Sequence, residues 1–394
     1  MKSTLFYDIE ITGHHTEYIS HLIDFITQNT DKTQYFFVLH PMFNLRFPEI
    51  REKALTCQYI TLIEITNDEL EKINTGNSLT KSINNYRLLI KYADKLHANS
   101  LFALHFNAFI FPLFINRPKY EISGILFHPF YRIEKSSFMS NLRYLRKYIQ
   151  TWLITRNRQI KTVFILNDNK TTNYLNRQFK TNIFRVLPDP IPEWSSIPDF
   201  SIHEKYSIKN ARRIFLHIGA LEERKGTFEI LDSFNSLNSE TRKNICLLIV
   251  GKANSDTHQV ILRKISDLKT RFPEVEIIYK NEFIANSLMK SLFEQSQFVL
   301  VPYKNTESSS GIIGHAIAAG SIIIGSNKGL LGELINSYEH SITLDEINPQ
   351  SIAIAINKAL SEFNCTQKYP IWKEYVDSHT SESFSRIMLL NNYK

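Results

Sequence analysis

Short apolar runs alternate with longer amphipathic segments along most of the chain. Apolar runs bounded by glycine or polar residues are typical of buried strands, and apolar residues at helical spacing are typical of helices. In the first half, strands are expected at residues 5–10, 35–40, 59–65, 101–106, 124–130 and 162–167, and the longest helix at 67–99. In the second half, strands are expected at 214–221, 245–251, 275–280, 298–303, 321–326 and 341–344. This alternation predicts an α/β fold whose parallel sheets are covered by helices on both faces.

A proline-rich segment divides the two halves. Four prolines stand between residues 187 and 198, and proline can neither continue a helix nor sit in a central strand. The chain of 394 residues is long enough for two or three domains. We therefore expect a first domain at 1–190, a linker at 191–212 and a second domain at 213–375. Residues 376–394 are expected to form a helix that packs back on the first domain.

The composition, with 43% hydrophobic and 22% charged residues, allows each domain to bury its own core. The three cysteines, Cys57, Cys246 and Cys365, are far apart and lack metal-ligand spacing, so neither a disulfide framework nor a zinc site is expected. The amino terminus lacks the apolar core of a signal peptide, and no apolar run reaches the length of a membrane span. We expect a cytoplasmic protein.

Basic residues of this chain, whose net charge is +7, cluster with apolar and aromatic residues at 141–161. A basic amphipathic helix of this kind is typical of proteins that attach to an anionic membrane surface, here the inner face of the cell membrane. It is equally typical of an ordinary solvated helix face, and both interpretations stay open. No nucleic-acid motif accompanies the cluster, so nucleic acid is not expected as a partner.

The segment 307–316 reads E-S-S-S-G-I-I-G-H-A and lies between two apolar runs, so it is expected to form the loop and helix of a βαβ unit. In open α/β sheets, such a helix start directs N–H groups and the positive end of its dipole at an anion. Glu307 would repel a phosphate and is expected to bind a sugar or ribose hydroxyl. The candidate phosphate-loop residues are Ser308, Ser309, Ser310, Gly311 and Gly314. Alternatively, the serines merely cap a helix and the glycines allow close packing.

A second candidate loop follows the strand expected at 214–221. Gly219 forms a turn there, and Arg224 and Lys225 stand just before a helix expected from Thr227. Two cations at a strand-to-helix turn suit a diphosphate better than they suit a solvated surface.

The order of these motifs resembles the carboxyl-terminal domain of GT-B glycosyltransferases, particularly the retaining enzymes of family 4. The matching motifs are G-A-L-E-E-R-K-G, V-P-Y-x5-S-S-G and G-x-L-G-E-L, and the resemblance covers residues 212–361 well. It implies two Rossmann-like domains facing across a cleft, with a nucleotide-sugar donor, a UDP- or GDP-sugar, on the second domain. A glycan or lipid-linked acceptor would bind the first. Enzymes of this fold replace a metal ion with protein charges, so no metal or other cofactor is implied.

The family pattern assigns roles to residues of the second domain. Lys225 matches the lysine that binds the donor diphosphate, but Ala220 stands where an arginine is expected, and we expect Arg224 to compensate. Glu307 matches the glutamate that holds the donor sugar. His315 replaces a second glutamate, which usually holds the ribose, and is itself a candidate donor-binding residue.

The first domain offers histidines at predicted strand ends. Gly13 and His14 occupy the place of the family's flexible glycine loop near the donor phosphates, and His15 follows as a candidate acceptor ligand. His105 matches a histidine that contacts the donor sugar near the reacting carbon, so it joins Lys225 and Glu307 as a candidate catalytic residue. His128 is a second candidate acceptor ligand.

The resemblance implies sugar transfer with retention of configuration, in which the leaving phosphate takes the acceptor proton, in the synthesis of cell-surface polysaccharide or glycoconjugates. Because Ala220 and His315 depart from the family pattern, a non-catalytic sugar-nucleotide or glycan-binding relative is the alternative. A Rossmann oxidoreductase or epimerase is a further alternative, although no G-x-G-x-x-G follows the first strand of either half.

Overall fold

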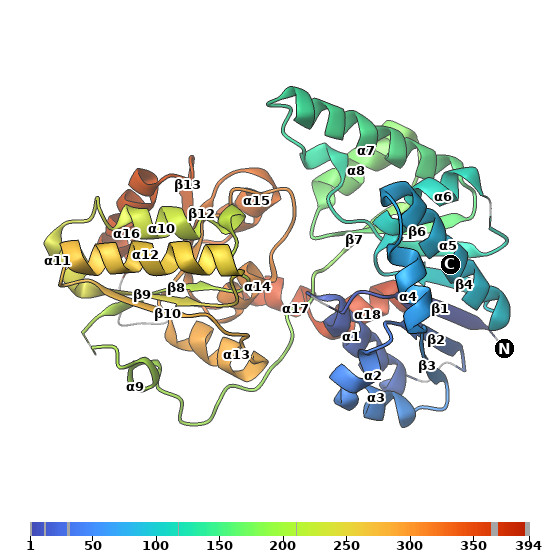
Figure 1. Ribbon diagram of the computed structural model, residues 1–394, viewed down its shortest axis with the longest axis horizontal. Coiled ribbons are helices and arrows are strands. Elements are labelled where there is room, and N and C mark those ends of the chain that lie inside the picture. The colour runs from blue at the N-terminus through green and yellow to red at the C-terminus, as the bar shows by residue number, and fades with distance from the viewer. Residues whose placement is uncertain are drawn as a thin grey trace. The chain divides into compact units, whose positions relative to one another are not determined.

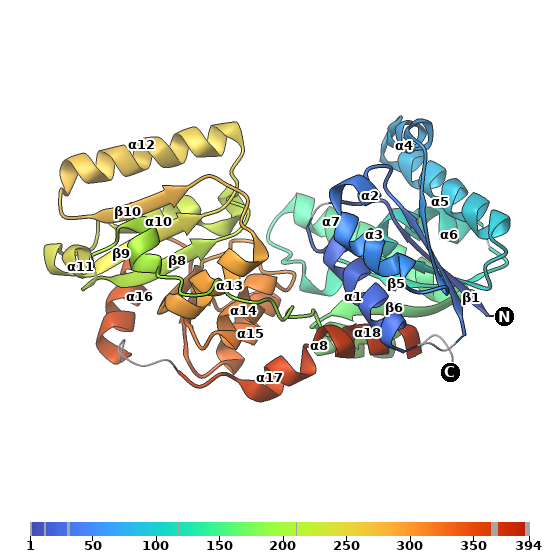
Figure 2. The same cartoon turned by 90° about the horizontal axis from the view of Figure 1, so that it is seen from below.

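The computed structural model describes residues 2–11, 13–29, 32–116, 118–209, 211–363 and 369–390. The chain forms two compact units, Met1–Asp189 with Ser381–Lys394, and Pro190–Thr380. Each unit is built on one parallel sheet with helices packed on both faces (Figures 1 and 2). The predicted α/β fold with two Rossmann-like sheets is therefore confirmed.

The sheet of the first unit has seven strands in the order β3-β2-β1-β4-β5-β6-β7. Its strands are β1 (Ser3–Asp8), β2 (Gln34–Leu39), β3 (Ile60–Glu64), β4 (Ser100–Ala103), β5 (Glu121–Ile125), β6 (Ile160–Leu166) and β7 (Phe184–Leu187). One face packs on α1 (His15–Gln28), α2 (Phe43–Arg46), α3 (Pro48–Leu55) and α18 (Ser381–Leu390). The other packs on α4 (Asn67–Asn74), α5 (Ser78–Lys95), η1 (Phe106–Phe109), α6 (Ile110–Ile115), η2 (Phe130–Arg132), α7 (Phe138–Arg156) and α8 (Asn169–Phe179).

Helix α18 returns the chain to the first unit, where it packs on α1. The rings of Tyr18 and Phe384 lie 4.8 Å apart, and the Ser385 hydroxyl donates to the His21 carbonyl at 3.0 Å. Residues 391–394 lie outside the described residues.

The helix expected over 67–99 is two helices, α4 and α5. Between them Gly76 adopts a φ of 84°, which residues with a side chain rarely adopt, and Asn77 caps α5 by accepting from the backbone N–H groups of Leu79 and Thr80. The backbone therefore turns at a point where the pattern of apolar residues continues.

The sheet of the second unit has six strands in the order β10-β9-β8-β11-β12-β13. They are β8 (Arg213–Ile218), β9 (Ile245–Val250), β10 (Glu276–Lys280), β11 (Phe298–Val301), β12 (Ile322–Ser326) and β13 (Ser341–Leu344). One face packs on α10 (Thr227–Ser233), α12 (Ser255–Arg271) and α16 (Pro349–Glu362). The other packs on α9 (Ile202–Tyr206), α13 (Asn286–Gln295), α14 (Gly311–Ala318), α15 (Gly329–Ser337) and α17 (Lys373–Ser378). Two shorter helices are η3 (Glu223–Lys225) and α11 (Ser239–Asn244).

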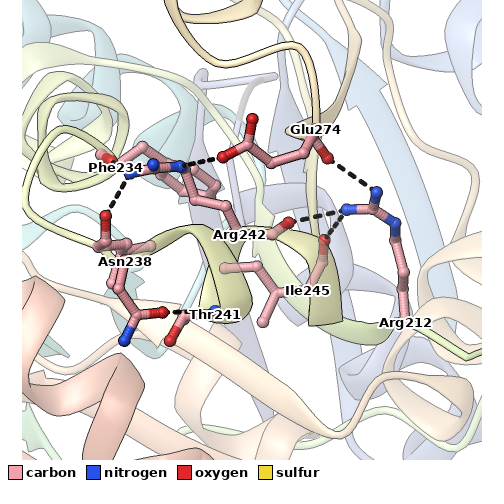
Figure 3. A network of polar contacts seen from close by, with 8 residues as sticks. Arg212, Phe234, Asn238, Thr241, Arg242, Ile245 and Glu274 are labelled. Atoms are coloured by element: carbon pink, nitrogen blue, oxygen red, sulfur yellow. Dashed lines mark hydrogen bonds and ion pairs between the residues drawn. The ribbon is translucent and has the colours of Figure 1, made fainter.

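A buried polar network closes the amino-terminal edge of this second sheet (Figure 3). The Arg212 guanidinium donates to the carbonyls of Arg242 (2.9 Å) and Ile245 (2.8 Å) and to the Glu274 carbonyl (2.8 Å). Arg242 in turn donates to the Glu274 carboxylate at 2.9 Å. These charges are satisfied by backbone and carboxylate groups, so they stabilise the starts of β8, β9 and β10. The carboxyl-terminal edge carries the residues expected to bind ligand.

Candidate active site

The loop between β8 and α10 is fixed by two glycines. Gly219, directly after β8, has a φ of 110°, and Gly226, directly before α10, has a φ of 74°. A Cβ on Gly226 would lie 2.3 Å from the Pro302 carbonyl oxygen, so only glycine fits there. The backbone N–H of Lys304 also donates to the Arg224 carbonyl at 2.8 Å. The loop is thereby held against the segment that follows β11.

Lys225 lies where this loop meets the start of α14. Its Nζ is 3.4 Å from the position that a Cβ on Gly219 would occupy, and the Ile312 side chain of α14 is 3.6 Å from the same position. The ammonium group also lies 5.0 Å from the centre of the Tyr303 ring. The structure thus brings three predicted features together: the glycine turn, the lysine and the start of the helix after the serines.

Arg224 occupies a different environment. Its side chain is half exposed and its Nε forms an ion pair with Glu222 at 2.5 Å. The neighbouring cation Lys304 pairs with Glu229 at 2.8 Å. Among these three cations, Lys225 is the one that the structure places against Gly219.

The residues from Glu307 to Ser310 form a half-buried loop that leads into α14. The Glu307 backbone N–H donates to the Asn305 side chain at 3.1 Å. Ser310 is the N-cap residue, but its side chain does not make a capping hydrogen bond to α14, which begins at Gly311. The interpretation that the serines merely cap the helix is therefore not supported by a hydrogen bond at Ser310. The first N–H groups of the helix are suited to an anion.

Two other residues of α14 pack within the second unit. A Cβ on Gly314 would lie 2.9 Å from the Ile191 side chain, so this glycine serves close packing and not the approach of a ligand. The His315 ring stacks on Trp194 (centroids 4.5 Å apart) and on Phe293 (5.6 Å). A nucleotide contact by His315 would therefore be made beside an aromatic side chain.

His217 is a functional candidate that the sequence pattern did not indicate. It is fully buried on β8, where Nδ1 lies 3.0 Å from the Leu300 carbonyl oxygen and Nε2 lies 2.9 Å from the Thr227 hydroxyl. Burial, and to a smaller extent the charge of Lys225, lower its pKa to about 4. A neutral ring satisfies both contacts when Nδ1–H donates and Nε2 accepts. His217 thus joins β11 to the start of α10 beneath the Lys225 loop.

In the first unit, His15 pairs with a buried carboxylate. Its Nδ1 lies 2.7 Å from Oδ2 of Asp8, the last residue of β1, whose side chain is 1% exposed. Burial alone would lower the His15 pKa, but the hydrogen bond to Asp8 and the negative charges of Asp8 and Glu10 leave it raised. Gly13 just before has a φ of 69° and open space at its Cβ position, and His14 is exposed.

His105 lies next to this pair. Its ring centre is 5.7 Å from that of His15, and both rings contact Phe127. Burial, together with the charge of His15, lowers the His105 pKa. The contacts of His128 are different. Its side chain is exposed, its φ is 51°, and its backbone carbonyl accepts a hydrogen bond from Lys147.

Both clusters lie at the points where the strand order reverses. Asp8 ends β1 and His105 follows the neighbouring strand β4, and Gly219 and the loop at 307–310 follow the neighbouring strands β8 and β11. Ligands of open parallel sheets bind at such switch points, beyond the carboxyl ends of the strands.

Among the described residues, no three histidine, cysteine or acidic side chains are grouped so that they could hold a metal ion. A search of the same residues finds no helix long and apolar enough to cross a membrane. Cys57 and Cys246 are buried free thiols, and Cys365 lies outside the described residues.

Known proteins resemble this chain in part of its sequence and in its fold. Residues 199–375 match the family described as glycosyl transferases group 1. Similar solved structures include a glycosyltransferase from Rickettsia africae, with 16% identity, a TM-score of 0.69, and coverage of 100% of this chain and 98% of that one. They also include sucrose-phosphate synthase from Thermosynechococcus elongatus, with 12% identity, a TM-score of 0.68, and coverage of 98% and 97%. Anabaena HepE, solved with UDP and glucose, has 15% identity, a TM-score of 0.62, and coverage of 100% and 98%.

No curated protein matches the sequence. The family match spans most of the second unit, which carries Lys225 and Glu307, and the structural matches extend over both units. The whole chain therefore has the GT-B fold of these glycosyltransferase structures, and the match of residues 199–375 to glycosyl transferases group 1 indicates an enzyme.

Proposed function

We propose that the protein transfers a sugar, with retention, from a nucleoside diphosphate donor to a glycan or lipid-linked acceptor in the synthesis of surface polysaccharide or glycoconjugates. The observation that carries the donor assignment is the meeting of Lys225, Gly219 and the start of α14. A cation and a helix start, with no side chain on the glycine between them, suit a diphosphate.

The chemistry follows from charge. When the bond between the anomeric carbon and the phosphate oxygen breaks, negative charge grows on the leaving diphosphate. Lys225 and the first N–H groups of α14 are fixed in place, so they stabilise that charge without reorganising. Glu307 would bind hydroxyls of the transferred sugar, and His315 would contact the nucleotide beside Trp194. Protein charges would replace a metal ion. The UDP and glucose of the Anabaena structure favour a UDP-sugar as the first donor to test.

The test combines donor binding with turnover. UDP- and GDP-sugars should raise the thermal unfolding temperature of the protein, because a bound ligand stabilises the native state. Lys225→Ala should weaken this stabilisation, whereas Lys243→Ala, at an exposed lysine of α11, should not. If neither donor stabilises the wild-type protein, or if Lys225→Ala binds normally, the donor assignment is wrong.

The non-catalytic alternative rests on Ala220 and His315, and the same experiment separates the two functions. An enzyme releases free nucleoside diphosphate over many turnovers as it transfers the sugar to an acceptor, or to water when no acceptor is present, whereas a binding protein retains the intact donor. Binding of a donor without release of diphosphate, across a panel of glycan and lipid-linked acceptors, would favour the binding protein.

We also propose peripheral attachment to an anionic membrane through α7. One face of this helix carries exposed apolar side chains at alternating intervals of four and three residues, so they form a stripe. Phe138 is 81% exposed and Leu142, Leu145, Ile149 and Trp152 are between 40% and 52% exposed. Such a stripe on an exposed helix is typical of an interfacial helix whose apolar face enters the lipid headgroup region.

The charge around the stripe favours an anionic partner. The chain has no acidic residue from Lys135 to Asn167, a segment that contains Arg143, Arg146 and Arg156. Each cation near an anionic membrane contributes about 1 kcal/mol, an attraction that salt screens. Attachment there would bring the first unit to a lipid-linked acceptor.

Sedimentation with anionic and neutral liposomes tests the attachment. The wild-type protein should bind anionic liposomes better at low salt than at high salt. Leu142→Gln with Leu145→Gln should abolish binding, whereas Leu262→Gln, at a half-exposed leucine of α12, should not. Lys147 is left unchanged in these variants because its ammonium group donates a hydrogen bond to the His128 carbonyl. If the wild-type protein does not sediment with liposomes at either salt concentration, the proposed attachment is wrong and the stripe is an ordinary solvated helix face.

A further inference from the structure

A buried carboxylate holds one imidazole of the first unit in a defined orientation. Oδ2 of Asp8 lies 2.7 Å from Nδ1 of His15, and its Oδ1 accepts the backbone N–H of Glu10 at 3.0 Å. Asp8 is the last residue of β1 and His15 is the first residue of α1, so both ends of the contact are fixed by regular secondary structure. Since a carboxylate only accepts hydrogen bonds, Nδ1 must carry the proton. The other nitrogen, Nε2, is then the accepting atom of the neutral ring.

The neighbouring imidazole has the opposite protonation preference. Burial and the charge of His15 lower the pKa of His105, whereas Asp8 and Glu10 raise that of His15 against its own burial. The titratable groups that act on these two rings are Asp8 at the end of β1, Glu10 just after it, His14 just before α1, and the rings themselves. Titratable groups whose pKa values are driven apart by their surroundings are typical of sites that handle protons.

We propose that Asp8 is a positioning residue for sugar transfer: it fixes His15 so that Nε2 accepts a hydrogen bond from a hydroxyl of the acceptor other than the one that reacts. This contact holds the acceptor in place, and the reacting hydroxyl keeps its own proton for the leaving phosphate. This inference rests on the proposed function and names the group that orients the acceptor. The acceptor is thereby defined by its chemistry, as a molecule with a second hydroxyl, besides the reacting one, that donates a hydrogen bond to the protein.

The inference predicts how acceptor use depends on pH. When His15 becomes protonated, both ring nitrogens are donors and Nε2 no longer accepts. The kcat/KM for acceptor should therefore fall as the pH falls through the His15 pKa. Asp8→Asn removes the charge that raises this pKa, so the acid limb of the profile should move to lower pH. A purely structural role for Asp8 would lower activity at every pH and leave the acid limb in place.

One variant of His15 separates the roles of its two nitrogens. The amide nitrogen of His15→Asn can take the place of Nδ1 and still donate to Asp8, but nothing replaces Nε2. This variant should fold normally and lose tenfold or more in kcat/KM for acceptor, while its Kd for UDP changes less than twofold. His97→Asn is the matched control, because His97 is exposed, precedes β4 at the opposite edge of the sheet, and has a φ of 49°, which asparagine tolerates.

The outcomes distinguish this inference from the proposed function. Full acceptor kcat/KM in His15→Asn, or an unmoved acid limb in Asp8→Asn, would overturn the role of the Asp8 and His15 pair. NMR titration measures the pKa of the His15 ring directly in the folded protein. This pKa should fall in Asp8→Asn even if turnover is too slow to measure. Failure of the wild-type protein to bind or consume any donor would instead overturn the proposed function.

Discussion

The buried ring of His217 should make the second unit lose stability in acid. Its pKa is about 4 in the folded protein, against about 6.5 for an ordinary histidine. Above pH 6.5 the ring is neutral in both the folded and unfolded states and has no effect. As the pH falls below 6.5, the unfolded chain binds a proton that the folded unit excludes, so the free energy of unfolding decreases. The loss is complete near pH 4 and amounts to about 3 kcal/mol, at 1.36 kcal/mol for each unit of pKa.

Hydrogen exchange of a peptide that spans β8 and the Lys225 loop measures this effect locally. Because the chain has two units, a single unfolding free energy for the whole protein is not well defined. Exchange of this peptide, corrected for the intrinsic pH dependence, should accelerate about 150-fold between pH 7 and pH 4 in the regime where exchange reports the opening equilibrium. In His217→Gln, which cannot titrate, the protection should be lower at pH 7 but nearly independent of pH. An equal pH dependence in wild type and His217→Gln, with His97→Asn as control, would refute the reasoning.

Three further predictions concern the donor site. Lys225→Ala should reduce kcat/KM for the donor by roughly 10- to 150-fold, the equivalent of a charge-assisted hydrogen bond of about 1.5 to 3 kcal/mol. Arg224→Ala should have a smaller effect, because Arg224 pairs with the exposed Glu222. Equal kinetics in wild type and the double variant would contradict both assignments. Glu307→Gln should lower kcat by tenfold or more with little change in the Kd for free UDP, since its carboxylate is proposed to contact the sugar; loss of UDP binding would assign it to the ribose. Gly219→Ala should weaken donor binding, measured by calorimetry, because it places a methyl group 3.4 Å from Nζ of Lys225 at a φ of 110°; an equal loss in Gly76→Ala, at a φ of 84°, would indicate general strain instead.

Most of the fold could be predicted from the sequence because the strands of both sheets are short apolar runs. Each of the twelve expected strands overlaps a strand of the structure, and the thirteenth, β7, was not expected. The half-buried Arg185 and Val186 of β7 make it a weaker apolar run beside the prolines. The helix expected over 67–99 was wrong because the turn at Gly76 does not interrupt the apolar periodicity. Local turn chemistry decided that break.

The candidate donor site could be predicted in part, for a similar reason. Glycines, serines and cations at strand ends are visible locally, and the structure brings Gly219, Lys225 and the start of α14 together. His217 and Asp8 could not be assigned in this way. Each is a single polar residue at or near the end of an apolar run. The role of His217 depends on Thr227 and that of Asp8 on His15, and these partners are recognisable only once the backbone between them has folded.

The two residues missed by the pattern occupy equivalent places in the two sheets. Asp8 ends β1 and His217 lies next to the end of β8, and these are the strands at which each sheet reverses its strand order. Each holds the first turn of the following helix, Asp8 through His15 and His217 through Thr227. A buried hydrogen bond fixes a loop more firmly than an exposed one, because breaking it leaves an unsatisfied polar group. Each unit thus positions its candidate ligand-binding loop from beneath, by one buried polar side chain.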